Sequence, residues 1–282
     1  MSNTPIAFIG GGNMARSLVG GLVSRGRDAG AIRVSEPMPA LREALHRDFG
    51  VQVVDGNAEA VSGAGTWVLA VKPQVLRGVC EALAPLAQQE RPLVVSIAAG
   101  IPTARIAAWL GGDAAVVRTM PNTPALLGAG ATGLFATPRV DAAGRDAAET
   151  LMRAAGLTAW IDDEALMDAV TAVSGSGPAY VFLLAEALQA AGEAEGLPAD
   201  TARALATQTL LGASRMLAES GEPAATLRQR VTSPNGTTQA ALEAFEAGGF
   251  RALVRDAVGA AARRGRELAA AGDPPPPPPA RP

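Results

Sequence analysis

Short apolar runs alternate with amphipathic segments along the chain up to about Ile161. The apolar runs, bounded by turn residues, predict strands at residues 5–10, 31–35, 51–54, 66–71, 92–97, 114–119, 131–136 and 157–161. Helical spacing lies between most of them, at residues 13–26, 38–49, 57–63, 73–89, 103–111 and 141–155. This alternation is typical of a parallel sheet covered by helices on both faces. Ligands of such sheets bind beyond the carboxyl ends of the strands, so we expect the chemistry at the strand exits.

From about Glu164 the strand signals stop. Helical patterns follow at residues 164–173, 178–195, 199–220, 223–231, 237–247 and 249–271. Residues 180–191 are apolar nearly all round, and such a helix must be covered on more than one side. A domain of roughly a hundred residues has little depth to cover it alone, so we expect subunits to pack together here.

A glycine triplet separates the first predicted strand from the first predicted helix. Gly10-x-Gly12-x-x-Ala15 fits the pattern of a dinucleotide-binding turn. Gly10 allows the tight turn, Gly12 lets the backbone approach a pyrophosphate, and Ala15 lets the helix pack on the strand. Many such turns need glycine and bind nothing, but the place between strand and helix favours a nucleotide. The residues assigned to the phosphates are Gly10, Gly11, Gly12, Asn13 and Met14.

Two further exits have side chains suited to the adenosine half of a dinucleotide. Glu36 follows the second strand, 24 residues past Gly12. An acid there can bond the ribose hydroxyls of NADH and repel the extra phosphate of NADPH, and a solvated turn residue before Pro37 explains it equally well. Asn57 follows the third strand, where it can cap the next helix or contact the adenosine end of the cofactor.

The exits of the fourth and fifth strands suit the nicotinamide half. Ala70, Val71, Lys72 and Pro73 follow the fourth strand, and proline is common at the first position of a helix. A lysine at this exit lies close to the expected nicotinamide ribose, so we interpret Lys72 as functional. The small residues from Ala98 to Gly100 leave room for a flat group.

Hydroxyl groups gather in the loop at residues 231–239, before the helix at 237–247. Ser233, Thr237 and Thr238 surround Gly236 where the helix starts. Exposed N–H groups and several hydroxyls form a receptor for a small carboxylate. Ordinary capping by Ser or Thr is the alternative, but one hydroxyl suffices for a cap.

Composition narrows the chemistry further. The net charge of −3 gives no general attraction to nucleic acid or to an anionic membrane. A single cysteine, Cys80, excludes an internal disulfide and a cysteine-based metal cluster, and we expect it to be buried and no metal to be bound. The lone His46, expected to face solvent, excludes a histidine acid and a serine triad. No secretion signal or long apolar span is evident, so we expect a soluble, cytoplasmic protein.

The motifs together resemble the pyrroline-5-carboxylate reductase family over nearly the whole chain. The matching segments are residues 8–15, 70–73, 94–100, 118–125, 174–180 and, most specifically, 231–242. The resemblance implies an α/β N-terminal Rossmann-type dinucleotide-binding domain at residues 1–162 and an all-α C-terminal dimerisation and substrate domain at 163–272. We expect the proline-rich tail at 273–282 to be disordered. The family's helical domains interlock in homodimers, often assembled into decamers, with the active site between one subunit's cofactor and its partner's helical domain.

The resemblance also implies the reaction: hydride transfer from NADPH or NADH to the imine carbon of pyrroline-5-carboxylate, which gives proline. Family members usually prefer NADPH, but Glu36 replaces the serine or threonine often found there and makes NADH more plausible. Ser233, Gly236 and Thr237 would hold the substrate carboxylate. Thr238 would bond the ring nitrogen, and Lys72 would lie beside the nicotinamide. Another small reductase, such as one for a 2-hydroxy acid, and a nucleotide-sensing regulator are the alternatives.

Overall fold

The computed structural model describes residues 4–271, and its chain forms two compact units. The first unit holds the chain up to Ser176 together with residues from Ala261 onward, and the second holds Gly177–Ala260. The predicted boundary between residues 162 and 163 is a separate, functional division and stays a prediction. The predicted tail at 273–282 lies outside the described residues.

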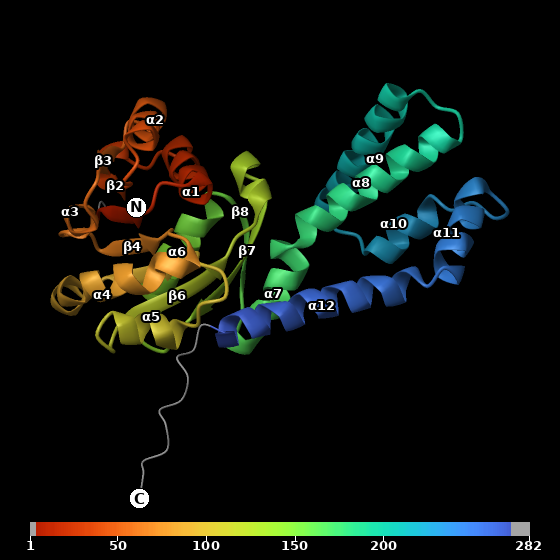
Figure 1. The fold of residues 1–282 in the computed structure, drawn as a ribbon. Helices are drawn as coiled ribbons and strands as arrows, with labels where there is room; N and C mark the ends of the chain where they lie inside the picture. The colour runs from red at the N-terminus through yellow and green to blue at the C-terminus, as the bar shows by residue number, and fades with distance from the viewer. Residues whose placement is uncertain (1–3, 272–282) are drawn as a thin grey trace, which may run out of the picture. The chain divides into compact units, whose positions relative to one another are not determined.

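The first unit is built on one eight-stranded sheet with the order β3-β2-β1-β4-β5-β6-β7-β8 (Figure 1). The eight strands match the eight predicted ones within a few residues. They are β1 (Ile6–Ile9), β2 (Ile32–Ser35), β3 (Gln52–Val54), β4 (Thr66–Leu69), β5 (Leu93–Ser96), β6 (Ala115–Met120), β7 (Gly130–Ala136) and β8 (Gly156–Trp160). The predicted α/β class with a Rossmann-type sheet is confirmed.

One strand direction differs from the prediction of a parallel sheet. β7 runs antiparallel to β6, with Thr119 opposite Leu134, whereas all other neighbouring strands are parallel. Residues 121–129 connect the two strands through a short 3-10 helix, η2 (Thr123–Leu127). A parallel neighbour needs a crossover of a dozen residues or more, so a connection this short returns the chain in the opposite direction.

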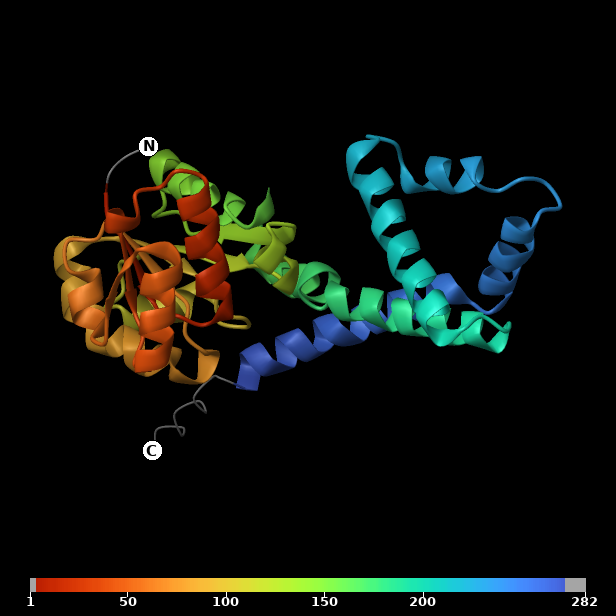
Figure 2. The same ribbon diagram turned by 90° about the horizontal axis from the view of Figure 1, so that it is seen from above.

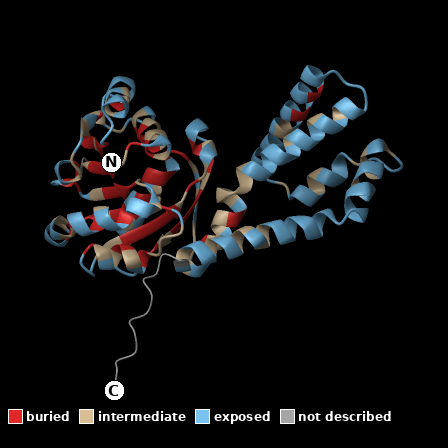
Figure 3. Cartoon of the chain, viewed as in Figure 1, coloured by how far each residue is buried: buried red, intermediate tan, exposed pale blue. Residues whose placement is uncertain are grey.

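Helices cover both faces of the sheet (Figures 1 and 2). Alternate side chains of β1 point to opposite sides, so Phe8 belongs to one buried cluster and Ile9 to the other. The buried residues gather on the sheet and on the inner sides of its helices (Figure 3). These helices are η1 (Ala29–Ala31), α1 (Asn13–Ser24), α2 (Pro39–Phe49), α3 (Asn57–Val61), α4 (Pro73–Glu90), α5 (Thr103–Trp109) and α6 (Ala142–Arg153).

The segment after β8 is less regular than the single helix predicted at 164–173. It passes through a 3-10 turn η3 (Glu164–Leu166), a short α7 (Met167–Val170) and a π-helical turn η4 (Thr171–Gly175). Glu164 is held at the start of this segment by the Arg118 guanidinium at 3.1 Å and the Thr103 hydroxyl at 2.7 Å. These tertiary bonds favour the tight 3-10 turn over a regular helix start.

The second unit is helical, as predicted. It contains α8 (Gly177–Ala194), α9 (Ala199–Glu219), α10 (Ala224–Arg230), α11 (Thr237–Ala247) and the start of α12 (Phe250–Ala271), which ends in the first unit. No residue of α8 is buried within the chain, although the helix is largely apolar. Its Phe182 and Leu183 are 62% and 66% exposed. An apolar helix left this open indicates that a second molecule covers it.

Candidate active site

The order of the strands reverses between β1 and β4. From β1 the chain continues outward through β2 and β3, whereas β4 starts the other half of the sheet. Crevices at such reversal points, beyond the carboxyl ends of the strands, hold the ligands of this fold. The glycine turn follows β1, and the segment from Ala70 to Pro73 follows β4, so the two predicted cofactor segments lie side by side.

The three glycines of the turn have different surroundings. Gly10 has φ +100°, and a Cβ there would lie 2.8 Å from the Ala70 carbonyl oxygen. A Cβ at Gly11 would lie 2.8 Å from Leu45 Cδ1 and 3.1 Å from Glu36 Cβ. A Cβ at Gly12 would meet nothing within 4 Å. Gly10 is therefore required by the backbone, Gly11 is packed closely against two side chains, and the space at Gly12 is open for a ligand.

The start of α1 can accept an anion. Gly12 is its N-cap, no side chain caps the helix, and its first turn contains no acid. The first N–H groups of a helix have no partner within it, and they present partial positive charge. The donors at Asn13 and Met14 therefore suit a pyrophosphate, and the geometry fits a dinucleotide.

Glu36 is buried beside the turn, with 7% of its surface exposed. Its Oε2 accepts the Gly11 N–H at 2.9 Å, and its Oε1 accepts the Met38 N–H at 3.0 Å. The alternative of a solvated turn residue is therefore wrong, because both carboxylate oxygens hold backbone donors.

Asn57 does not cap the helix after β3. Gly56 is the N-cap of α3, and Asn57 is its first residue. The Asn57 Oδ1 instead accepts the Ser35 hydroxyl at 2.6 Å, across the exits of two neighbouring strands. The expectation of a cap is wrong, whereas the contact with the adenosine end stays a prediction.

The segment after β4 lies against the glycine turn. The Ala70 N–H donates to the Ile9 carbonyl at 2.9 Å. Lys72 is the N-cap of α4, Pro73 is its first residue, and the exposed Lys72 side chain makes no hydrogen bond or ion pair within residues 4–271. The small Ala98 is buried next to this segment, where the Ala98 N–H donates to Ser96 Oγ at 3.3 Å.

In the second unit the hydroxyl-rich loop is not used for capping. The N-cap of α11 is Gly236, and no side chain caps the helix. Asn235 takes a left-handed conformation with φ 58°, and its N–H donates to Gln239 Oε1 at 2.8 Å. Ordinary Ser or Thr capping is therefore wrong for this loop. The hydroxyls of Ser233 and Thr238 stay available to a ligand, as do the first N–H groups of α11.

Two polar residues for which the sequence predicted no role, Asn122 in the matching segment 118–125 and Glu164, connect distant parts of the first unit. Asn122 donates from Nδ2 to the Ser174 carbonyl at 3.0 Å and accepts the Ala131 N–H at 2.9 Å. Glu164 binds Arg118 and Thr103, residues 46 and 61 positions away. Such partners are invisible in sequence because no local spacing relates them.

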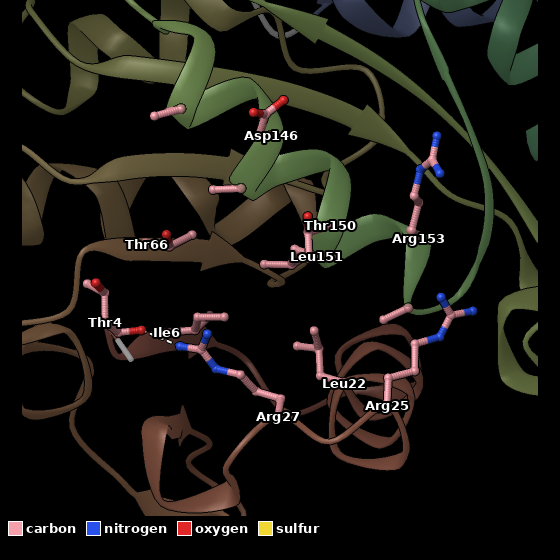
Figure 4. A pocket seen from close by; sticks show the side chains of 13 residues that line it. Thr4, Ile6, Leu22, Arg25, Arg27, Thr66, Asp146, Thr150, Leu151 and Arg153 are labelled. Carbon is pink, nitrogen blue, oxygen red and sulfur yellow. Dashed lines mark hydrogen bonds between the residues drawn. The ribbon is translucent and has the colours of Figure 1, made fainter. Parts of the chain in front are cut away.

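A cavity of about 480 Å³ opens near the amino ends of the strands, whereas the candidate active site lies beyond their carboxyl ends (Figure 4). Ile6 and Thr66, at the amino ends of β1 and β4, lie on its wall together with Arg25 and Arg27. None of the predicted site residues lines it, so it is separate from the candidate active site.

The remaining candidate groups for acid or nucleophilic chemistry fit structural roles. Burial raises the pKa of the Cys80 thiol to about 12, so Cys80 stays protonated at neutral pH. His46 is exposed on α2, as predicted, with its Nδ1 3.0 Å from the Val51 carbonyl oxygen. Neither residue lies in the glycine turn or in the hydroxyl-rich loop.

Two family models match the chain. Residues 164–268 match the model described as pyrroline-5-carboxylate reductase dimerisation. Residues 5–100 match the model described as NADP oxidoreductase, coenzyme F420-dependent. Among residues 4–271, no helix combines the length and apolar character needed to cross a membrane.

Close relatives share almost the full length of the chain. A pyrroline-5-carboxylate reductase of Pseudomonas aeruginosa is 55% identical over 95% of this chain and 98% of its own. The protein of that name from Haemophilus influenzae is 42% identical with the same coverage. The structure of a pyrroline-5-carboxylate reductase from Coxiella burnetii superposes with a TM-score of 0.92 at 44% identity, covering 95% of this chain and 99% of that one. A Plasmodium falciparum pyrroline carboxylate reductase with NADP bound gives a TM-score of 0.82 at 27% identity, with the same coverage.

Proposed function

Because this chain belongs to the pyrroline-5-carboxylate reductase family, we propose that it reduces pyrroline-5-carboxylate to proline with NADPH or NADH. The observation that carries the proposal is the uncapped, glycine-lined start of α1 at the point where the strand order reverses. It fits the pyrophosphate of a dinucleotide, and no histidine or cysteine chemistry competes with it there.

The first unit holds the coenzyme in this proposal. The coenzyme supplies the hydride that reaches the imine carbon. The N–H groups at the start of α1 bind the pyrophosphate, and Glu36 and Asn57 face the adenosine half. The residues that border the nicotinamide half are Ala70, Val71, Lys72, Pro73 and Ala98. Lys72 extends from the N-cap of α4 without a partner in the described chain, so its charge is available beside the ribose.

The loop before α11 holds the substrate. The hydroxyl of Ser233 and the N–H groups of Gly236 and Thr237 at the start of the helix bind the carboxylate, and the Gly236 N–H, which donates to the Ser233 carbonyl at 3.1 Å, is shared between the two acceptors. Thr238 bonds the ring nitrogen and orients the imine, because its hydroxyl can donate to a neutral imine nitrogen or accept the N–H of a protonated one. A threonine hydroxyl is too weak an acid to protonate the nitrogen at neutral pH. The proton therefore comes from water or is already on the imine when it binds. Fixing the two reacting carbons in contact can supply roughly 7–11 kcal/mol of the rate enhancement.

We further propose that residues 163–272 form the dimerisation and substrate domain. The match of residues 164–268 to a dimerisation model supports self-association. The open apolar face of α8 supports an interlocked homodimer, with decamers as a further stage. In that dimer the substrate loop of one subunit meets the coenzyme of its partner. The cytoplasm is the proposed compartment.

The test is the oxidation of each reduced coenzyme, followed at 340 nm in the presence of pyrroline-5-carboxylate. We expect turnover with pyrroline-5-carboxylate and none with a 2-oxo acid in its place. Turnover with the 2-oxo acid alone would favour a 2-hydroxy acid dehydrogenase. Coenzyme binding without turnover on either substrate would favour a nucleotide-sensing protein.

A further inference from the structure

The carboxylate of Glu36 lies where the adenosine ribose of a dinucleotide meets the sheet. β2 ends at Ser35, and Glu36 is the next residue, next to the glycine turn. Resting on the proposed function, we propose that Glu36 makes this enzyme prefer NADH over NADPH. Its carboxylate accepts hydrogen bonds from the free ribose hydroxyls of NADH and repels the 2′-phosphate of NADPH.

The position of the carboxylate is fixed from two sides. The Gly11 N–H holds Oε2 at 2.9 Å, and the Met38 N–H holds Oε1 at 3.0 Å. Each carboxylate oxygen accepts more than one hydrogen bond, so both remain able to bind a hydroxyl. An exposed glutamate could rotate away from an incoming phosphate, whereas this one would have to release two backbone donors.

The glycine turn itself depends on this side chain. A Cβ at Gly11 would lie 3.1 Å from Glu36 Cβ and 3.3 Å from Glu36 Cγ, so the two residues pack directly on each other. The same carboxylate thus contacts the loop that faces the pyrophosphate. Its charge is therefore built into the coenzyme site.

The neighbouring charges are of both signs. Asp55 follows β3, the strand next to β2, and adds a second carboxylate at this edge. Arg42 is the opposing group, and its Nη1 donates to the carbonyl oxygens of Glu36 and Pro37 at 2.7 and 3.0 Å. Arg42 thus lies on the carbonyl side of the turn, whereas the Glu36 carboxylate lies on the glycine side. We therefore expect the carboxylate to decide the preference.

Calorimetric titration of the full chain with NADH and with NADPH, without substrate, tests this assignment. We expect NADH to bind at least about tenfold more tightly, because two like charges at close range strongly oppose each other. Glu36→Gln keeps the shape and one acceptor oxygen but removes the charge. It should tighten NADPH binding and change NADH binding little. Glu43→Gln, an exposed acid on the same α2 helix, is the control and should leave both affinities unchanged.

Two results would overturn the assignment. Equal or tighter binding of NADPH by the unaltered chain refutes it. If NADPH binding were then lost in Arg42→Gln, Arg42 would be the residue that determines the preference. An equal weakening of both coenzymes in Glu36→Gln would leave Glu36 as a mere support of the turn. Should Glu36→Gln not fold, Glu36→Ser provides the same comparison. Binding with the expected preference but no turnover of pyrroline-5-carboxylate would refute the proposed function and leave this inference standing.

Discussion

Three consecutive glycines in this chain serve three different purposes. Gly10 has a backbone conformation that other residues rarely adopt and touches the Ala70 carbonyl. Gly11 leaves room for Leu45 and for the side chain of Glu36. Gly12 has φ −67° and open space around it, so the fold alone does not require glycine there. Gly10 and Gly11 therefore serve the structure of the turn, whereas Gly12 leaves space for a ligand.

Substitution by valine should separate these purposes. Gly12→Val should abolish dinucleotide binding at a cost in unfolding free energy below about 1 kcal/mol, as for a changed helix cap. Gly10→Val should cost about 1–3 kcal/mol or more, because it combines a strained φ with a backbone clash. Tryptophan fluorescence measures the stability, since Trp67, Trp109 and Trp160 all lie in the first unit. Normal coenzyme titration of Gly12→Val would contradict the phosphate assignment.

The assignment of Thr238 is tested in the same way at a single side chain. Thr238→Ala should lower kcat about 10²-fold or more, as expected when an orienting hydrogen bond in the transition state is lost. Coenzyme affinity should stay unchanged, because Thr238 contacts only the substrate in the proposed complex. Thr201→Ala is the matched control, since Thr201 also lies in the first turn of a helix. Equal turnover of the Thr238 and Thr201 variants would remove Thr238 from the site.

At the scale of elements, α6 is attached to β8 by one carboxylate. Glu149 accepts hydrogen bonds from Trp160 Nε1 at 3.0 Å, Arg153 Nη2 at 2.8 Å and Thr158 Oγ1 at 3.2 Å. The hydrogen bond from Trp160, followed by that from Arg153, lowers the pKa of Glu149 from its ordinary value of 4.5. A lowered pKa in the folded state means that ionisation of this group stabilises the fold.

The stabilisation by Glu149 should therefore be present at neutral pH and lost in acid. It is complete above the unfolded pKa of 4.5 and disappears as the pH falls through the lower folded value. Glu149→Gln should unfold at a lower temperature than the unaltered chain at pH 7, and the difference should shrink below about pH 4.5. Thermal unfolding followed by tryptophan fluorescence measures both. A difference that stays constant down to pH 3, or an equal effect of Glu43→Gln, would count against this role of Glu149.

Local pattern was sufficient to predict the strands and most helices, and the reasons for the failures are physical. The direction of β7 depends on the length of the connection after β6, which apolar periodicity does not encode. The bond between Glu36 and Gly11 joins residues 25 positions apart, so its burial could not be foreseen from a turn sequence. Asn57 looked like a cap because Asn favours caps, but the Ser35 hydroxyl of a neighbouring strand binds its side chain. The hydroxyl-rich loop was predicted in the right place because its helix start is local.

At the scale of the whole molecule, the second unit has too little core of its own. Phe182, Leu183 and Val181 are exposed on α8, and Leu253 and Phe245 are exposed on α12 and α11. Exposed apolar surface of this extent is typical of an interface within a permanent oligomer. Self-association thus accounts for a pattern that a single chain leaves unexplained.

A charge placed on this surface should separate the subunits. We expect Leu183→Glu to elute as a smaller species than the unaltered chain in size exclusion with light scattering, because a carboxylate would be buried unpaired in the interface. Leu157→Glu is the control and should leave the mass unchanged. Leu157 lies in the first unit, and its exposed fraction of 70% is close to that of Leu183. An unaltered mass of the Leu183 variant would contradict a role of α8 in association.

The way the chain returns to its first unit affects the order of events during synthesis. Arg105 Nη2 donates to the Ala269 carbonyl at 2.9 Å, and Gly265 approaches the Asp168 carboxylate, so the end of α12 packs on elements made much earlier. Domains generally fold as they leave the ribosome, with the amino-terminal one first. Here the earliest unit to emerge stays incomplete until almost the last turn of helix has been translated. A nascent chain halted after Ser176 would carry the entire sheet and still lack part of its own surface.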